Sequence, residues 1–293
     1  MKHPSTLLFS SLAVFILLLA KVDRLNLKAA HGFCLHAVDV PLTPNLSWQT
    51  LEPFPTKILE QTFTYLDKGA QNFVFESEDQ NYVLKFYRFP SRLRQFSFVS
   101  HPFSFLVPSK TAEAKSYSER RVQFSYNSYF LASRYLKQET GVIYVHLNPT
   151  PDLDPKVRLK DRAGHFYELP LANIGFVLQK KGQPFLPLLK SRIQHQQIHL
   201  AEQMIDSLIH LIVSRCSRGI TDLDNMANDN YGWAEDHAVH LDIGRFVPHE
   251  EMKKISVYRQ EVIRVTSPLA RYLKKNSPEL SQYYEQQISK IGA

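Results

Sequence analysis

The sequence predicts an α+β protein with two lobes: a β-rich lobe with one long helix, then a smaller helical lobe. Short alternating strand patterns recur between residues 62 and 179, with a single long helical pattern among them. After the hinge-like stretch 180–184, KKGQP, amphipathic helical patterns dominate. At 293 residues and 44% hydrophobic content, the chain is long enough to bury a core in each lobe.

The first 55 residues are expected to form a hydrophobic segment and a linker. Residues 7–20, LLFSSLAVFILLLA, are uncharged, and a stretch this short suits a signal-peptide core better than a membrane span. No small-x-small cleavage site follows, however, and Lys21, Arg24 and Lys28 come directly after the segment. By the positive-inside rule these cations favour a domain kept in the cytoplasm. We therefore expect an uncleaved membrane anchor, with secretion after signal cleavage as the alternative.

The β-rich lobe is predicted to cover residues 56–181. It opens with three antiparallel strands joined by polar turns, expected at 63–66, 72–75 and 82–87. A long helix with one apolar face is expected over 111–138 and ends at Gly141. Four further strands complete this lobe, expected at 142–147, 157–159, 165–169 and 174–179.

The helical lobe is predicted to cover residues 182–293. Apolar residues recur at helical spacing from Ile198 to Cys216, and this helix is expected to end near Gly219. A polar loop follows. The remaining elements are two short strands and two helices, expected at 230–233, 238–241, 250–275 and 278–288.

Composition restricts the classes of partner and site. The net charge of +7 favours acidic partners such as nucleotides or phosphorylated groups, but the cations are dispersed, so no nucleic-acid partner is expected. Cys34 and Cys216 are the two cysteines, which excludes a disulfide framework. His195 and His199 lie four residues apart without an acid or cysteine set nearby, and they are expected to be exposed helix residues rather than zinc ligands.

The most informative stretch is 218–246, RGITDLDNMANDNYGWAEDHAVHLDIGRF. Asp222 and Asp224 lie in a polar loop after the long helix, and two hairpin strands would bring Asn230 and Asp242 to the same end. Their amide and carboxylate oxygens are ligands that Mg²⁺ prefers. The alternative is a solvated connection, because Asp and Asn also cap helices and form turns.

Two upstream features have the same ambiguity. Gly69 lies in a tight turn between strands, where backbone amides can approach phosphate oxygens closely, although for this glycine taken alone an ordinary hairpin turn is the better explanation. Lys85 lies in the middle of a strand, between Leu84 and Phe86. Its ammonium could extend to solvent or could meet phosphates and a carboxylate of the long helix, for which Glu119 and Glu113 are the candidates.

The joint order of these motifs resembles the protein-kinase-like fold, as found in a group of bacterial kinase-like proteins. The resemblance covers about residues 63–246 and depends on the order of five motifs. These are the glycine-loop register Leu66, Gly69 and Val74; Val83-Leu84-Lys85; Arg218 to Asp224; Asn230; and Leu241 to Gly244.

The resemblance implies roles for these residues. Gly69, Val74 and Lys85 would hold ATP, with Lys85 paired to an acid such as Glu119, and Asn230 and Asp242 would hold Mg²⁺. Asp222 or Asp224 would accept the proton of the attacking hydroxyl. An ATP-dependent phosphotransferase tethered to the membrane is the expected function, with a small molecule, lipid or protein as acceptor.

The chain also departs from the family pattern. Asp67 and Asn72 replace two loop glycines, Arg218 to Thr221 stand in place of the usual His-Arg-Asp lead, and no Ala-Pro-Glu follows Gly244. Protein-substrate phosphorylation is therefore doubtful. The alternatives are a pseudokinase that acts as a nucleotide-binding or interaction module, and an unrelated membrane-anchored interaction protein.

Overall fold

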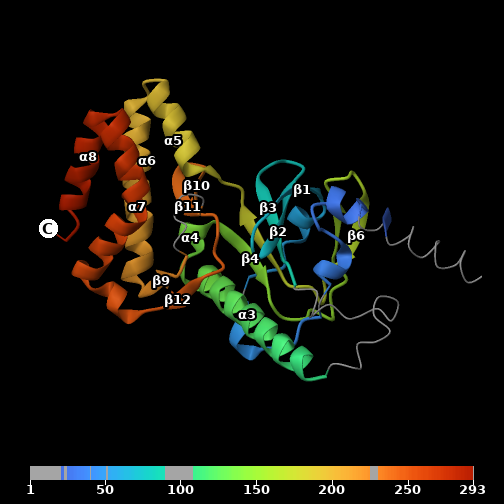
Figure 1. Ribbon diagram of the computed structural model, residues 1–293. Helices are drawn as coiled ribbons and strands as arrows, with labels where there is room; N and C mark the ends of the chain where they lie inside the picture. Colours follow the sequence, from blue (N-terminus) through green and yellow to red (C-terminus); the bar gives the residue numbers. More distant parts are fainter. Residues whose placement is uncertain are drawn as a thin grey trace, which may run out of the picture.

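The computed structural model describes residues 21–22, 25–39, 41–50, 52–89, 108–224 and 230–292. These residues form two lobes, a sheet with one long helix and a bundle of helices, joined by a short connection (Figure 1). The predicted two-lobed α+β arrangement is confirmed.

The first lobe is built on a seven-stranded sheet in the order β4-β7-β3-β2-β1-β5-β6. All neighbours are antiparallel except β1 and β5, which run parallel. The β5–β6 hairpin therefore extends the sheet on the side away from β4. The strands are β1 (Thr62–Lys68), β2 (Asn72–Ser77), β3 (Tyr82–Tyr87), β4 (Val142–His146), β5 (Lys156–Lys160), β6 (Phe166–Pro170) and β7 (Phe176–Lys180).

The long helix of this lobe is α3 (Pro108–Tyr135), followed by the short helix α4 (Lys137–Thr140). Gly141 ends α4 in the left-handed conformation, with φ of 62°, which glycine adopts without a steric penalty. Buried α3 residues such as Tyr129 and Ala132 pack with Val145 of β4 and Phe246 of β12. The predicted helix and its end at Gly141 thus agree with the structure, with one break at residue 136.

The opposite face of the sheet is covered by the N-terminal segment. The covering residues include η1 (Leu35–Ala37) and α2 (Thr56–Leu59), whereas Trp48 of η2 (Leu46–Trp48) lies on the other side, with its ring 5.5 Å from that of Tyr126 in α3. Phe33 is buried, and its ring lies 5.4 Å from that of Phe73 and 4.9 Å from that of Phe75. Residues expected to be a linker therefore form part of the core. This face of the sheet is rich in aromatic side chains, and covering it with apolar residues removes that surface from water.

The second lobe packs around α6, whose buried face runs from Ala201 to Cys216. Helices α5, α7 and α8 pack against α6. Two small sheets lie on the side of this lobe that faces the first lobe (Figure 1). The elements are β8 (Gln183–Pro184), α5 (Phe185–Gln194), α6 (Ile198–Ser217), β9 (Ile220–Asp222), β10 (Tyr231–Ala234), β11 (His237–His240), β12 (Phe246–Pro248), η4 (Glu250–Lys253), α7 (Ile255–Asn276) and α8 (Pro278–Ser289).

The predicted membrane-anchored localisation requires correction. Among the described residues, no helix is both long enough and apolar enough to cross a membrane. The long helices of these ranges are amphipathic or polar, and α6 and α7 use their apolar faces in the core of the second lobe. Residues 7–20, on which the anchor and the alternative signal peptide rested, lie outside the described residues.

Candidate functional site

Lys85 lies on β3 where the two lobes meet. Its Nζ donates a hydrogen bond of 2.5 Å to the backbone oxygen of Leu241 in the second lobe. Val74 is the direct β2 partner of Lys85, so the two side chains share one face of the sheet. Burial lowers the pKa of Lys85 to about 8, although the Asp242 carboxylate acts in the opposite direction.

The β10–β11 hairpin carries the two predicted metal ligands. Tyr231 pairs with His240, and beyond this pair the Leu241 amide donates to the Asn230 oxygen at 2.7 Å. The two strands are therefore still paired at Asn230, which begins the hairpin. Asp242 follows Leu241 directly on the returning strand. The structure brings these residues to the same end of the hairpin, beside Lys85.

Asn230 and Asp242 differ in their surroundings. Asn230 is buried, and among the described residues its amide nitrogen has no hydrogen-bond partner. Asp242 is exposed and accepts a hydrogen bond of 3.1 Å from the Gly244 amide, which orients the carboxylate. The unpartnered nitrogen is a donor and cannot bind a metal ion, but the side-chain oxygen of Asn230 and the carboxylate of Asp242 are the ligand types that Mg²⁺ takes, one or two from the protein with phosphate and water completing its shell.

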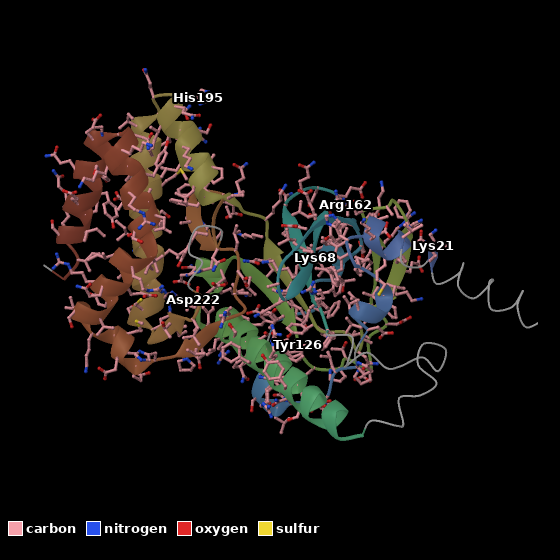
Figure 2. The ribbon with its side chains drawn as sticks, in the orientation of Figure 1. Lys21, Lys68, Tyr126, Arg162, His195 and Asp222 are labelled. Atoms are coloured by element: carbon pink, nitrogen blue, oxygen red, sulfur yellow. The ribbon has the colours of Figure 1, made fainter. Side chains whose placement is uncertain are left out.

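Asp222 lies at the end of β9, between the helical lobe and the sheet lobe (Figure 2). Its carboxylate is buried and accepts a hydrogen bond of 2.9 Å from the Asp224 amide. Burial raises the pKa of Asp222 to about 6. The nearby acids Asp224 and Asp242 add to this rise, while the Asp224 amide bond and Arg215 oppose it. Asp222 is thus ionised at neutral pH but close to its titration range, as suits a general base.

The other two predicted nucleotide-binding positions are less informative. Gly69 lies in the β1–β2 turn, where its amide donates to the Asn72 oxygen at 3.0 Å, and a side chain there would meet only that oxygen, at 3.9 Å. Glu119 lies on an exposed part of α3, and the side chain of Glu113 lies outside the description. The predicted pairing of Lys85 with an acid of α3 remains a prediction.

Three polar residues of α3 that the sequence analysis missed connect the candidate site to the first lobe. Ser128 Oγ donates to the Ile243 oxygen at 2.5 Å and accepts from the Phe246 amide at 2.6 Å. The hydroxyl of Tyr129 donates to Asn72 at 3.0 Å, and that of Ser125 donates to Gln71 at 3.1 Å. Helix α3 therefore holds both the turn after Asp242 and the β1–β2 turn. Polar side chains spaced three and four residues apart on the apolar face of the predicted helix were the available signal.

A buried ion pair supports the strand that carries Asp222. Arg215 of α6 donates from Nη2 to Glu261 of α7 at 2.8 Å and from Nη1 to the Ile220 oxygen at 3.2 Å. The Arg215 side chain is fully buried and that of Glu261 is 5% exposed. This pair fixes the start of β9 against the helices, and the β9–β12 pairing then joins Asp222 to Phe246.

Comparison with known proteins gives weak matches. No protein-family model and no curated protein matches the chain. Among solved structures, the chain is similar to the bifunctional kinase-methyltransferase WbdD at 15% identity, with a TM-score of 0.34, over 76% of this chain and 43% of that one. A crystal structure of WbdD at 2.2 Å gives 15% identity and a TM-score of 0.36, over 78% and 46%.

Another similar structure is the complex of Rv3197 with erythromycin from Mycobacterium tuberculosis, at 12% identity and a TM-score of 0.34. The match covers 72% of this chain and 56% of Rv3197, so the chain spans about half the length of these proteins. Superpositions this loose carry no argument about activity.

The order of the elements agrees with the predicted kinase-like arrangement: three antiparallel strands, a long helix, two more core strands, a connection, a helical lobe, and a hairpin that ends in Leu241-Asp242-Ile243-Gly244. The return strand β12 pairs with β9, which brings the segment after Gly244 back beside Asp222. The predicted resemblance is confirmed at the level of the fold. The roles of the individual residues stay predictions.

Proposed function

We propose that this kinase-like protein is an ATP-dependent phosphotransferase. The observation that carries the proposal is the meeting of Lys85 from the first lobe with Asp222, Asn230 and Asp242 from the second. An ammonium, a carboxylate of raised pKa and a pair of oxygen ligands are the groups that phosphoryl transfer requires, since the reaction depends on positioning and on charge neutralisation.

Each residue has a distinct role in this proposal. Lys85 binds phosphate oxygens, and Asn230 and Asp242 hold Mg²⁺. The bound ion supplies neutralisation of the phosphate charge. Asp222 orients the acceptor hydroxyl and takes its proton on a carboxylate oxygen, and Asp224 is the alternative for this role. Ser128 keeps the turn after Asp242 in place.

The acceptor is best taken as a small hydroxyl compound. The strand β12 begins at Phe246, two residues after Gly244, and then leads through η4 to α7. A segment this short offers little surface for docking an extended peptide beside the site. A lipid headgroup has the same chemistry as a small hydroxyl compound and remains within the proposed class.

A nucleotide-binding pseudokinase is the second candidate. The hydrogen bond of Lys85 to the Leu241 oxygen favours it, because that bond occupies one of the three ammonium N–H groups. Asp67 near the β1–β2 turn also favours it, because its negative charge would repel phosphate. In this reading nucleotide binding stabilises the two lobes without turnover.

The first experiment measures thermal stabilisation by ATP with and without Mg²⁺. A ligand that binds only the folded state raises the apparent stability, by about 2.7 kcal/mol at a hundredfold excess over Kd. The proposal expects a shift that requires both components and that Lys85→Met and Asp242→Asn reduce. Lys190→Ala, an exposed position on α5, is the matched control. No shift at millimolar Mg-ATP would sink both nucleotide-binding readings.

The second experiment separates the enzyme from the pseudokinase. Purified full-length protein is incubated with γ-labelled ATP and Mg²⁺, and release of phosphate and label on the protein are both measured. Phosphotransferase activity predicts turnover that Asp222→Asn and Asp242→Asn abolish. Binding without turnover in the wild type, over a range of hydroxyl compounds, would identify the pseudokinase.

A further inference from the structure

The tip of the β1–β2 turn reaches the loop that carries Asp242. A Cβ atom at Gly244 would collide with the side-chain oxygen of Gln71, and Asp242 Oδ1 would lie 3.4 Å from the same atom. Gln71 and Gly244 are therefore in contact across the lobes, close to the carboxylate proposed to hold Mg²⁺. Position 244 needs a glycine for this approach, since any larger residue would push the Gln71 side chain away.

Hydrogen bonds hold Gln71 in this position. Its side-chain oxygen accepts from Ser125 Oγ of α3 at 3.1 Å. Arg88, directly after β3, donates from its amide to the Gln71 backbone oxygen at 2.7 Å and from its guanidinium to the Ala70 oxygen at 2.9 Å. The turn is thus fixed twice, by α3 through the Gln71 side chain and by Arg88 through the backbone.

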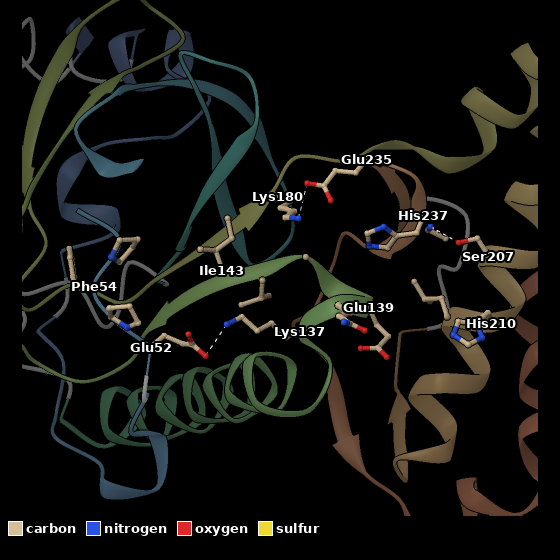
Figure 3. A pocket seen from close by; sticks show the side chains of 17 residues that line it. Glu52, Phe54, Lys137, Glu139, Ile143, Lys180, Ser207, His210, Glu235 and His237 are labelled. Carbon is tan, nitrogen blue, oxygen red and sulfur yellow. Dashed lines mark hydrogen bonds and ion pairs between the residues drawn. The ribbon is translucent and has the colours of Figure 1, made fainter. Parts of the chain in front are cut away.

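The other end of these strands is joined to the second lobe by a different contact. Lys180 of β7 pairs with Glu235 of the β10–β11 turn at 2.7 Å, beside a cavity that residues of both lobes line (Figure 3). Lys180 lies at the level of Tyr82, where β3 begins, whereas the β1–β2 turn lies beyond Tyr87, where β3 ends. Roughly 20 Å of strand therefore separate this ion pair from Gln71. Access to the metal loop under the β1–β2 turn depends on Gln71 rather than on the lobe connection.

The atom that Gln71 places at Gly244 is unsuitable for contact with phosphate. A side-chain amide oxygen is an acceptor, and so are phosphate oxygens, so the two repel each other at contact distance. Two oxygens bound to one Mg²⁺ lie at most about 4 Å apart, so a phosphate that shares an ion with Asp242 needs the space next to this carboxylate. The Gln71 oxygen and such a phosphate compete for the same surroundings.

We propose that the contact of Ser125, Gln71 and Gly244 is a latch that keeps the β1–β2 turn closed over the nucleotide site. In the closed state Gln71 covers Gly244, and in the open state it gives up its bond to Ser125 and leaves the space beside Asp242 to phosphate. The latch rests on the proposed function, because it takes Asp242 as the residue that holds Mg-ATP. A latch lowers the apparent affinity in proportion to the fraction of molecules in which it is open.

The test measures Mg-ATP affinity by calorimetry in the full-length wild type and in two variants that open the latch. Gln71→Ala removes the side chain from Gly244, and Ser125→Ala removes the donor that holds this side chain. Each is expected to bind Mg-ATP about threefold to tenfold more tightly than the wild type, the effect of one neutral hydrogen bond. Adenosine, which has no phosphate, is expected to bind all three proteins equally.

The matched control is Gln282→Ala, at an exposed position on α8, which is expected to bind Mg-ATP as the wild type does. Thermal melts without ligand verify that every variant is folded. Unchanged Mg-ATP affinity in folded Gln71→Ala would overturn the latch, and so would weaker binding, which would make Gln71 a phosphate ligand instead. An equal gain in adenosine affinity would overturn it as well, because the change would then not concern phosphate.

The same measurements separate the latch from the proposed function. If the wild type binds Mg-ATP, Lys85→Met weakens this binding and Gln71→Ala gains no affinity, the latch alone is wrong. If neither the wild type nor Gln71→Ala binds Mg-ATP, the proposed function is wrong together with the latch. Binding by Gln71→Ala and not by the wild type would support both.

Discussion

The buried ion pair between Arg215 and Glu261 gives the sharpest test of how the helices support the candidate site. Glu261→Ala removes a carboxylate that accepts three hydrogen bonds: from Arg215 at 2.8 Å and from Arg264 at 2.7 and 2.9 Å. After the change, Arg215 keeps only its bond of 3.2 Å to the Ile220 oxygen, and its charge remains in the core without a hydrogen-bonded carboxylate.

The magnitude follows from burial. Arg215 is 0% exposed and Glu261 5%, so breaking their pair is expected to lower the free energy of unfolding by about 3–5 kcal/mol. Arg264 is 42% exposed, and a pair at this exposure contributes about 0–1 kcal/mol because solvent screens it. The control Arg264→Ala should therefore cost at most about 1 kcal/mol.

Urea unfolding, followed by far-UV circular dichroism and by tryptophan fluorescence, measures these differences. The double variant Arg215→Met/Glu261→Leu removes both charges together and is expected to recover most of the loss, because no unpaired charge is left in the core. A loss in Glu261→Ala no larger than that in Arg264→Ala would refute the reasoning. So would a double variant as unstable as the single one.

Three further predictions concern the site itself. Ser128→Ala leaves the Phe246 amide and the Ile243 oxygen without a hydroxyl partner, so we expect about 1–3 kcal/mol lower stability in urea and weaker Mg-ATP binding by calorimetry; Mg-ATP affinity equal to that of the wild type would contradict the positioning role. Burial lowers the pKa of Lys85 to about 8, so Lys85 loses its charge and Mg-ATP affinity should fall as pH rises through 8. Lys85→Arg, which stays charged, should bind Mg-ATP without this decline. Equal pH profiles for the two proteins would exclude Lys85 as the titrating group. Burial raises the pKa of Asp222 from 3.8 to about 6, so between about pH 4 and 6 the folded state binds a proton that the unfolded state has released. The free energy of unfolding of the wild type therefore falls as pH rises through this range. Asp222→Asn should then be more stable than the wild type at pH 7, by up to about 3 kcal/mol, with the difference vanishing below pH 4; a constant difference over this range would exclude the titration.

Much of the fold could be predicted because its signals are local. Strand alternation, polar turns and helical spacing depend on neighbours within a few residues, and they placed the seven strands of the first lobe and α6 close to their observed bounds. The meeting of Asn230 and Asp242 was also predictable, since a tight hairpin returns the chain to the level at which it started.

The parts that could not be predicted depend on contacts between distant segments. The burial of Phe33 against the sheet is one case, because a short stretch between polar residues looks like a linker until a partner face is known. The expected membrane localisation failed for a related reason: it rested on the hydropathy of residues 7–20 alone, while the described residues contain no spanning helix. Hydropathy indicates what a segment could bury, and tertiary structure decides where it does so.

The sequence by itself predicted the two-lobed order from local patterns of strands and helices, and its resemblance to the protein-kinase-like fold singled out the candidate residues Lys85, Asp222, Asn230 and Asp242. Only the tertiary structure decided that Lys85 meets Leu241 across the lobes, that Ser128 holds the turn after Asp242, and that residues of both lobes line one cavity at their connection. These contacts join residues more than a hundred positions apart in the first two cases, and the packing of whole elements sets such distances.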